Sequence, residues 1–119
     1  MNGSCPANIV IEADGSAYPC DFYVLDEYRM GNITDCSIGE LLDSDVSHRF
    51  RERANKIDEK CKKCRFFRLC RGGCARFREP FGETGLQLNK YCESYTAFFE
   101  KNADRIVYLA RLAAQGKIK

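Results

Sequence analysis

The fold of this chain is decided by the stretch Cys61-Lys62-Lys63-Cys64-Arg65-Phe66-Phe67-Arg68-Leu69-Cys70-Arg71-Gly72-Gly73-Cys74. Its four cysteines are separated by two, five and three residues, and two glycines stand directly before the last of them. Packing alone has no need for so many thiols in so short a segment, whereas metal sites do. The segment therefore predicts a cysteine-rich loop that is organised around metal.

Three further cysteines extend this array in both directions. Upstream, Cys5 and Cys20 flank Gly15 at intervals of nine and four residues, and Cys92 follows downstream. The eighth cysteine, Cys36, fits no interval of the array, so we expect it to be a small spare residue at a helix start. The ordered set has seven members: Cys5, Cys20, Cys61, Cys64, Cys70, Cys74 and Cys92.

Three kinds of site compete for these thiols. Disulfides need an oxidising compartment, yet residues 1–6 lack the basic start and apolar run of a secretory signal. Zinc prefers two close pairs of ligands, and only Cys61 and Cys64 form one, although recombinant thiol sites often capture zinc when iron is scarce. Iron–sulfur clusters take four thiolates from separated segments of uneven spacing, so they fit best.

Basic residues surround the same cysteines. Residues 49–78 carry twelve Lys and Arg side chains against three acids, in a chain of net charge +2. A solvated helix face explains about half of them, and cations near the ligands would offset the negative charge of a thiolate-bound cluster. A nucleic-acid footprint is the alternative, but Phe66, Phe67 and Phe77 lie between cysteines instead of interleaving with the charges. We expect no nucleic-acid partner.

Length and hydropathy limit the architecture. With 119 residues, of which 45% are hydrophobic, residues 1–119 make one small domain whose modest core leans on its metal sites for stability. No apolar stretch approaches the length of a membrane span. We therefore expect a cytoplasmic protein with no membrane partner.

Strand signals are concentrated near the N-terminus. Residues 9–12 and 17–19 are rich in β-formers and flank Ala13-Asp14-Gly15-Ser16, where Asp-Gly supplies the positive φ of a tight hairpin turn. An apolar run follows at residues 22–25, and Gly31-Asn32 is expected to turn the chain.

Helix signals dominate the rest, which predicts the α+β class with a long C-terminal helix. Ser37-Ile38-Gly39-Glu40 has the pattern of a capping box, and the helix it starts should carry Ile38, Leu41 and Leu42 inward. Residues 46–56 predict a second helix, anchored by Phe50 and with His48 on its solvated surface. Residues 88–115 predict one amphipathic helix whose apolar stripe is core: Tyr95, Phe98, Phe99, Ile106, Leu109 and Ala113.

Together these residues resemble the SPASM domain, the C-terminal module of many radical S-adenosylmethionine (SAM) peptide-modifying enzymes. The similarity is greatest to the anaerobic sulfatase-maturating enzymes and covers nearly the whole chain. Its most specific parts are residues 14–25, 31–33, 61–74 and 91–92. The CxxxCxxC run of the radical SAM core is absent, so we expect no SAM site in these residues and no activity from this chain alone.

The resemblance implies two auxiliary 4Fe–4S clusters, and hence two metal sites. Cys61, Cys64, Cys70 and Cys92 match the ligands of the second. Cys5, Cys20 and Cys74 match three ligands of the first, and the fourth lies in the family just upstream of the position of Met1. Three alternatives follow for the first site: a ligand outside this sequence, replacement by Cys36, or an incomplete site that holds another metal, such as zinc.

The resemblance also implies an activity for the parent enzyme, the oxidation of a sulfatase cysteine or serine to formylglycine. Asp21, directly after Cys20, matches the family's base, and a carboxylate in a poorly solvated cleft beside an anionic cluster is a stronger base than one in water. The implied partners are a radical SAM domain with SAM and a third cluster, a sulfatase peptide and an external electron carrier. The alternatives are another SPASM-containing peptide modifier and a zinc-bound interaction module.

Overall fold

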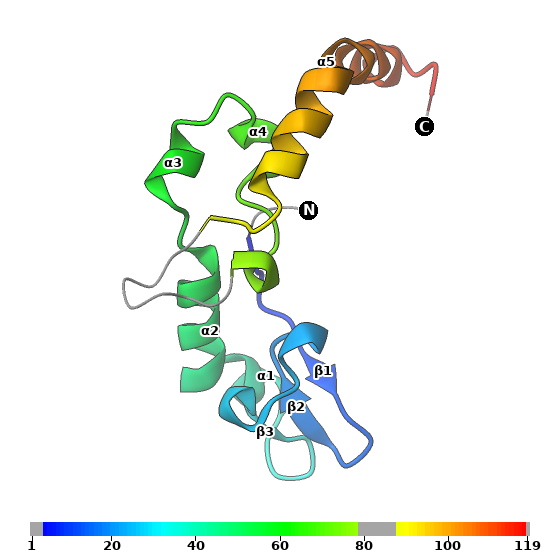
Figure 1. Cartoon of the computed structure of the whole chain (residues 1–119). Helices are drawn as coiled ribbons and strands as arrows, with labels where there is room; N and C mark the ends of the chain where they lie inside the picture. The colour runs from blue at the N-terminus through cyan, green and yellow to red at the C-terminus, as the bar shows by residue number, and fades with distance from the viewer. Residues whose placement is uncertain (1–3, 79–87, 119) are drawn as a thin grey trace. The chain divides into compact units, whose positions relative to one another are not determined.

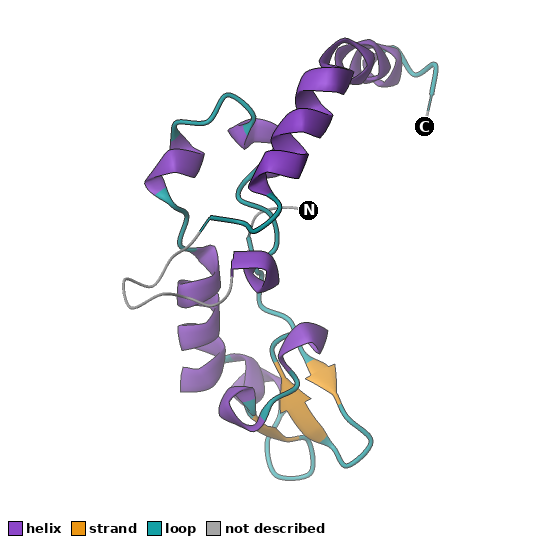
Figure 2. Ribbon diagram, viewed as in Figure 1, coloured by secondary structure: helices purple, strands orange, loops and turns teal. Residues whose placement is uncertain are grey.

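The computed structural model describes residues 4–78 and 88–118 (Figure 1). The chain divides into two compact units, Met1–Asn89 and Lys90–Lys119. The described residues form a small antiparallel sheet and helices of different lengths, which agrees with the predicted α+β class (Figure 2). No helix among them is both long and apolar enough to cross a membrane.

The sheet has three short strands in the order β1 (Val10–Ile11), β2 (Ser16–Tyr18) and β3 (Gly31–Asn32). The predicted hairpin is confirmed, although its strands are shorter than expected, and it pairs Val10 with Tyr18 and Ile11 with Ala17. The prediction that Gly31-Asn32 turns the chain is wrong. These two residues pair with β2 as its second neighbour, and the turn follows them.

The hairpin turn and β3 are tied together by side chains. Asn32 donates through Nδ2 to the carbonyl oxygen of Asp14 at 2.9 Å. Gly15 has φ +82°, and a Cβ there would lie 2.6 Å from Oδ1 of Asn32, so only glycine fits. The backbone N–H and the hydroxyl of Ser16 both donate to the carboxylate of Asp14 at 2.9 Å and lower its pKa.

Helix α1 (Ile38–Leu42) begins with the predicted capping box. The Glu40 N–H donates to Ser37 Oγ at 3.3 Å, and the backbone N–H and hydroxyl of Ser37 donate to Glu40 Oε2 and lower the pKa of that carboxyl. Leu41 is buried with Ala17 and Met30, as predicted. Ile38 is 57% exposed, so the prediction that it points inward is wrong. The buried cluster of Ala17, Met30 and Leu41, called here the second cluster, takes only Leu41 from this helix.

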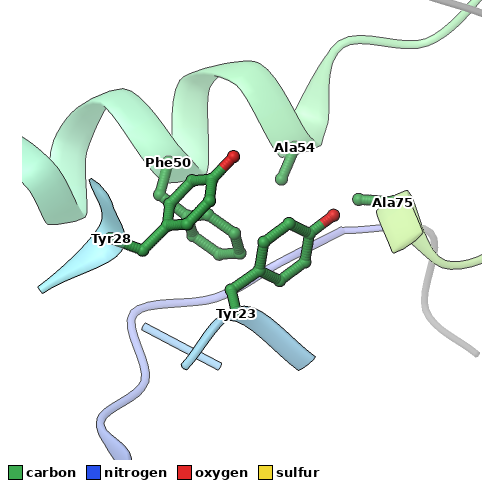
Figure 3. Close-up of a cluster of buried hydrophobic side chains, with 5 residues drawn as sticks. All are labelled: Tyr23, Tyr28, Phe50, Ala54 and Ala75. Atoms are coloured by element: carbon green, nitrogen blue, oxygen red, sulfur yellow. The ribbon is translucent and has the colours of Figure 1, made fainter. Parts of the chain in front are cut away.

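Helix α2 (Asp45–Asn55) confirms the predicted second helix and builds the larger core. The rings of Tyr23, Tyr28 and Phe50 meet edge to face, with centroids 5.0 to 5.9 Å apart (Figure 3). Two 3₁₀ turns, η1 (Asp21–Tyr23) and η2 (Asp26–Tyr28), carry the two tyrosines, and Ala54 and Ala75 complete this aromatic cluster. Within the predicted apolar run, Phe22 and Leu25 remain about half exposed.

The cysteine-rich segment contains more helix than expected. Residues 60–74 were predicted as a loop, but α3 (Glu59–Lys62) and α4 (Phe67–Cys70) each form one helical turn there, and η3 (Ala75–Arg78) follows. The Asp58 carboxylate accepts from the Lys60 N–H at 2.8 Å and caps α3. A single turn carries too few residues for a hydrophobic period to show, which is why the pattern gave no signal.

The second unit is the long helix α5 (Cys92–Ala114), which begins four residues later than predicted. The prediction that its apolar stripe is core is wrong, since none of its described side chains is buried. Phe98 is 56% exposed and Leu109 is 42% exposed. Within its own unit this helix has no second element against which an apolar face can pack.

Candidate metal centres

Cys5 is fixed to the C-terminal end of α2. Its backbone N–H donates to Oδ1 of Asn55 at 2.6 Å, and Nδ2 of Asn55 donates to the Cys5 carbonyl at 3.2 Å. This two-point bond joins residues fifty positions apart in the sequence. These two hydrogen bonds fix the segment around Cys5, which has no helix or strand, to helix α2.

Cys20 and Cys74 reach the same region from two other segments. Cys20 precedes η1, its carbonyl accepts from the Tyr23 N–H at 2.9 Å, and its side chain packs with Cys5 against the aromatic cluster. Cys74 directly precedes Ala75, which is a member of that cluster. The structure therefore places Cys5 and Cys20 on one buried core and Cys74 next to a member of that core, and the assignment of the three as ligands of one site stays a prediction.

The electrostatics of these thiols reflect that proximity. Burial raises the pKa of Cys5, the neighbouring Cys74 raises it further, and the guanidinium of Arg78 opposes both. Burial also raises the pKa of Cys20; the backbone N–H of Phe22 opposes this, while Asp21 and Cys5 add to it. Burial and neighbouring thiols both favour the neutral form, and a bound metal would favour the thiolate instead.

Asp21 lies beside this first site. The Cys20 thiol donates to Oδ1 of Asp21 at 3.3 Å, so the carboxylate reaches the sulfur of a candidate ligand. The side chain is solvent-exposed, and the poorly solvated cleft that we expected is not built by the described residues of this chain alone.

Cys36 lies with a different set of residues. It packs against the second cluster of Ala17, Met30 and Leu41, and a Cβ added to Gly31 would lie 3.7 Å from its sulfur. Cys5 and Cys20 pack against the aromatic cluster instead. The packing supports the prediction that Cys36 is a small apolar residue, and that role stays a prediction.

The second candidate site is built locally. Cys61 lies in α3, Cys70 ends α4, and between them the Phe66 N–H donates to the sulfur of Cys64 at 3.4 Å. Hydrogen bonds from backbone N–H groups to sulfur are typical of iron–sulfur sites. Cys92 is the first residue of α5 and belongs to the second unit.

A left-handed turn separates the ligands of the two sites. Arg71, Gly72 and Gly73 have φ values of +52°, +80° and +67°, so the glycines adopt the positive φ that a sharp turn between Cys70 and Cys74 predicts. The carbonyl of Gly72 accepts from Nδ2 of Asn89 at 3.3 Å.

No three His, Cys, Asp or Glu side chains in residues 4–78 and 88–118 are grouped closely enough to bind a single metal ion. The thiols of the first site nevertheless influence one another's ionisation. A cluster is wider than one ion and takes its thiolates from separated segments. The donor set of the first site fits such a group.

Sequence reasoning missed Arg78. It was one of twelve cations in the basic block, yet it is only 2% exposed. Its Nη1 and Nη2 donate to the carbonyls of Lys56 and Ala54, at 2.5 and 2.6 Å. No periodicity or motif distinguishes it, because its burial depends on the end of a helix more than twenty residues away.

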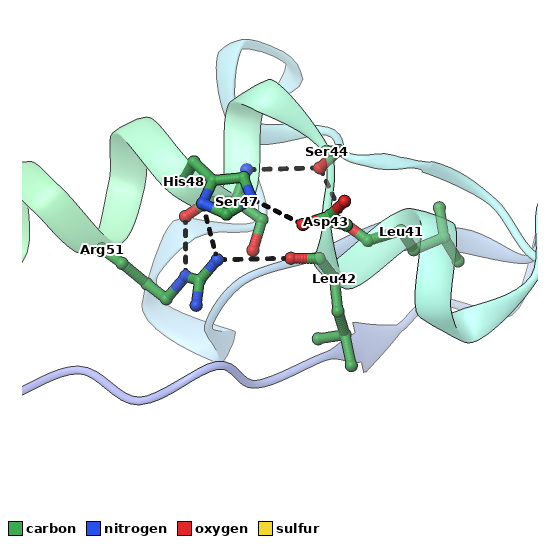
Figure 4. A network of polar contacts seen from close by, with 7 residues as sticks. All are labelled: Leu41, Leu42, Asp43, Ser44, Ser47, His48 and Arg51. Carbon is green, nitrogen blue, oxygen red and sulfur yellow. Dashed lines mark hydrogen bonds and ion pairs between the residues drawn. The ribbon is translucent and has the colours of Figure 1, made fainter.

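His48 lies on the exposed face of α2, as expected, and has polar partners there (Figure 4). Its Nε2 is 2.8 Å from Oδ1 of Asp43, and its Nδ1 is 3.0 Å from Nη2 of Arg51. Arg51 also donates to the carbonyls of Leu42 and Ser47. These contacts link the α1–α2 junction to the first turns of α2 and include no cysteine.

The family model for the SPASM iron–sulfur cluster-binding domain matches residues 5–65, which is half of the chain. The chain belongs to this family of iron–sulfur cluster-binding domains. The family resemblance read from the sequence is thus confirmed.

Individual relatives make the comparison more specific. The chain is 49% identical over 110 residues to a cysteine-type anaerobic sulfatase-maturating enzyme of Clostridium perfringens (strain ATCC 13124), which covers 92% of this chain and 30% of that enzyme. It is 47% identical over 114 residues to a cysteine-type enzyme of Clostridium novyi (strain NT), with 96% and 30% covered. A serine-type enzyme of Bacteroides thetaiotaomicron is 33% identical over 106 residues, with 86% and 25% covered.

Solved structures agree with this. Native anSMEcpe with bound AdoMet superposes with a TM-score of 0.87 at 49% identity, covering 93% of this chain and 30% of that one. The same protein with AdoMet and the Cp18Cys peptide gives a TM-score of 0.88, with 93% and 31% covered. The chain thus spans about 30% of the length of the relatives that it matches.

Proposed function

We propose that this chain is the auxiliary-cluster domain of a radical SAM enzyme that oxidises a sulfatase cysteine to formylglycine. The observation that carries the proposal is the carboxylate of Asp21, which lies 3.3 Å from the sulfur of Cys20 within a group of three converging thiols. The choice of cysteine over serine rests on identities of 47–49% to cysteine-type enzymes against 28–33% to serine-type ones.

Two 4Fe–4S clusters are proposed as cofactors. Cys5, Cys20 and Cys74 would hold the first, with a fourth ligand from outside the described residues. Cys61, Cys64, Cys70 and Cys92 would hold the second. The uneven spacing of the cysteines and an N–H···S bond to Cys64 favour clusters over a single zinc ion.

The proposed reaction removes one hydrogen atom, one proton and one electron from the substrate cysteine. A 5′-deoxyadenosyl radical, made in the radical SAM domain of the parent polypeptide, takes the hydrogen atom from Cβ. Loss of the thiol proton and of one electron leaves a thioaldehyde, and water converts it to the aldehyde with release of hydrogen sulfide. Clusters held by these cysteines would supply the acceptor for that electron, and an external carrier would be the final acceptor.

Asp21 is the proposed acceptor of the thiol proton. Its Oδ1 accepts from the Cys20 thiol at 3.3 Å. A thiolate that binds metal has no proton to donate, so with Cys20 as a ligand this oxygen would be free to accept a proton from the substrate. The aromatic cluster holds Cys20, and the η1 turn that starts at Asp21 holds the carboxylate one residue away.

The test is Asp21→Asn in the complete enzyme, with Asp26→Asn as a matched control at an exposed carboxylate of the next 3₁₀ turn. Asparagine keeps the shape but cannot accept the proton, so formylglycine formation in a cysteine-containing sulfatase peptide should fall about 10²- to 10⁴-fold. Iron content and SAM cleavage should match the parent and the control. Product formation at the parent rate would remove Asp21 from the mechanism.

A further inference from the structure

Arg78 is the most deeply buried charged side chain in the described part of the chain. It ends η3, four residues after Cys74, and both of its Nη nitrogens donate to carbonyls at the end of α2. These carbonyls belong to residues 54 and 56, where a helix has acceptors to spare and a partial negative charge. This anchoring fixes the position of the guanidinium.

The same end of α2 also holds Cys5. Asn55 lies between Ala54 and Lys56, whose carbonyls accept from Arg78, and it binds the backbone of Cys5 at both the N–H and the carbonyl. Three consecutive residues of one helix end therefore position a ligand of the first site and a buried cation together. Ala75, in the same 3₁₀ turn as Arg78, packs in the aromatic cluster against which Cys5 and Cys20 lie.

One N–H of the Arg78 guanidinium has no acceptor in the described residues. Its Nε is buried and has no hydrogen-bond partner among the described residues. A buried N–H without an acceptor is unfavourable, and native proteins rarely leave one. The guanidinium and the backbone of Cys5 are held by the same end of α2, and Cys74 directly precedes the 3₁₀ turn that Arg78 ends.

We propose that Arg78 is the fixed counter-cation of the first iron–sulfur centre, with its two Nη groups anchored on α2 and its Nε–H donating to a sulfur of that centre. A nearby positive charge and an N–H···S bond both favour the more negative, reduced form of a cluster, so Arg78 raises the reduction potential of the first site. The inference rests on the proposed loading of that site and not on the identity of the substrate.

The potential of the first cluster tests this role. The complete enzyme would be used, with the radical SAM cysteines replaced so that only auxiliary clusters remain, and titrated under EPR detection. Arg78→Gln should lower the potential so that the reduction equilibrium falls about tenfold, which is about 59 mV for one electron, at unchanged iron content. Arg78→Lys, which keeps the charge, should stay nearer the parent value.

The matched control is Arg49→Gln, which removes an exposed cation from α2 without touching the described site. It should leave the potential unchanged. If Arg78→Gln holds its iron at the parent potential, Arg78 merely caps the helix, and the proposal fails. This result would leave the proposed enzymatic activity standing, because the titration involves no substrate.

A second measurement needs no variant and covers the case in which Arg78→Gln does not fold. The parent protein, grown with ¹⁵N-arginine, is reduced and examined by pulsed EPR for coupling between the cluster spin and arginine nitrogen. A ¹⁵N coupling at the first cluster, retained in Arg49→Gln, is expected from an Nε–H···S bond. Absence of any arginine coupling would overturn the proposed hydrogen bond.

Discussion

The two candidate metal sites are built in different ways. The first is set against a buried aromatic core, to which Cys5 and Cys20 pack and to which Cys74 is adjacent. The second has three of its candidate ligands, Cys61, Cys64 and Cys70, in and between α3 and α4, neither of which has a buried side chain. Apolar packing thus supports Cys5 and Cys20 of the first site, whereas among the described residues Cys61, Cys64 and Cys70 belong to neither buried cluster.

Removal of metal should reveal this difference most strongly. After anaerobic chelation of the loaded protein, the backbone amides of α3 and α4 should lose nearly all protection from hydrogen exchange, because no core holds them. The amides of α2 should keep most of theirs. Equal loss in both regions would mean that the first site also depends on its metal for its fold.

Phe50→Ala tests the core beneath the first site. Phe50 is 5% exposed and contacts both tyrosine rings, so the variant should lose about 3–5 kcal/mol of unfolding free energy. Denaturant titration measures the loss. Phe22→Ala is the matched control, because Phe22 is 55% exposed and its removal should cost about 0.5 kcal/mol or less. A similar loss in both variants would show that the aromatic cluster does not support this region.

Gly72→Ala acts on the turn between the two sites. With φ +80° and Cδ1 of Ile57 3.3 Å from a new Cβ, alanine should destabilise the turn by about 1–2 kcal/mol. Iron content and thermal unfolding would both register the change. Gly39→Ala, in helix α1 with Ser37 Oγ 3.9 Å away, should instead be neutral or stabilise by about 0.5–1 kcal/mol. A neutral Gly72→Ala would show that the turn tolerates a side chain.

The smallest effect should come from protonation of two carboxylates that lie outside the candidate metal sites, Asp14 and Glu40. Hydrogen bonds lower the folded-state pKa of Asp14 and of Glu40, so the stability they contribute is present above the ordinary carboxyl range of about pH 4 and is lost as pH falls through the lower folded values. NMR of the hairpin turn and the α1 N-terminus would follow the change. Asp14→Asn should remove the pH-dependent change of the NMR signals in the hairpin turn, and Glu40→Gln should remove it at the α1 N-terminus. If the hairpin turn still responds to acid in Asp14→Asn, or the α1 N-terminus in Glu40→Gln, the assignment to these carboxylates is wrong.

Local chemistry was predictable wherever it depends on neighbouring residues. The Asp-Gly hairpin, the Ser37–Glu40 capping box and the positive φ of Gly72 and Gly73 all follow from positions within a few residues of one another. The predictions failed where distant partners decide. Gly31-Asn32 became a strand because β2 offered it an edge, and Ile38 stayed exposed because Leu41 alone fills a small cluster.

The sequence by itself determined the family of this protein and the number of its thiols, because the spacing of cysteines along the chain can be read without knowing any contact in the fold. Only the tertiary structure decided that Cys5 and Cys20 pack on one core while Cys36 packs on another. It alone distinguished Arg78 from eleven other cations of the basic block. The reason is physical: burial and hydrogen bonding at the end of α2 arise from contacts between segments twenty to fifty residues apart, and no local pattern encodes them.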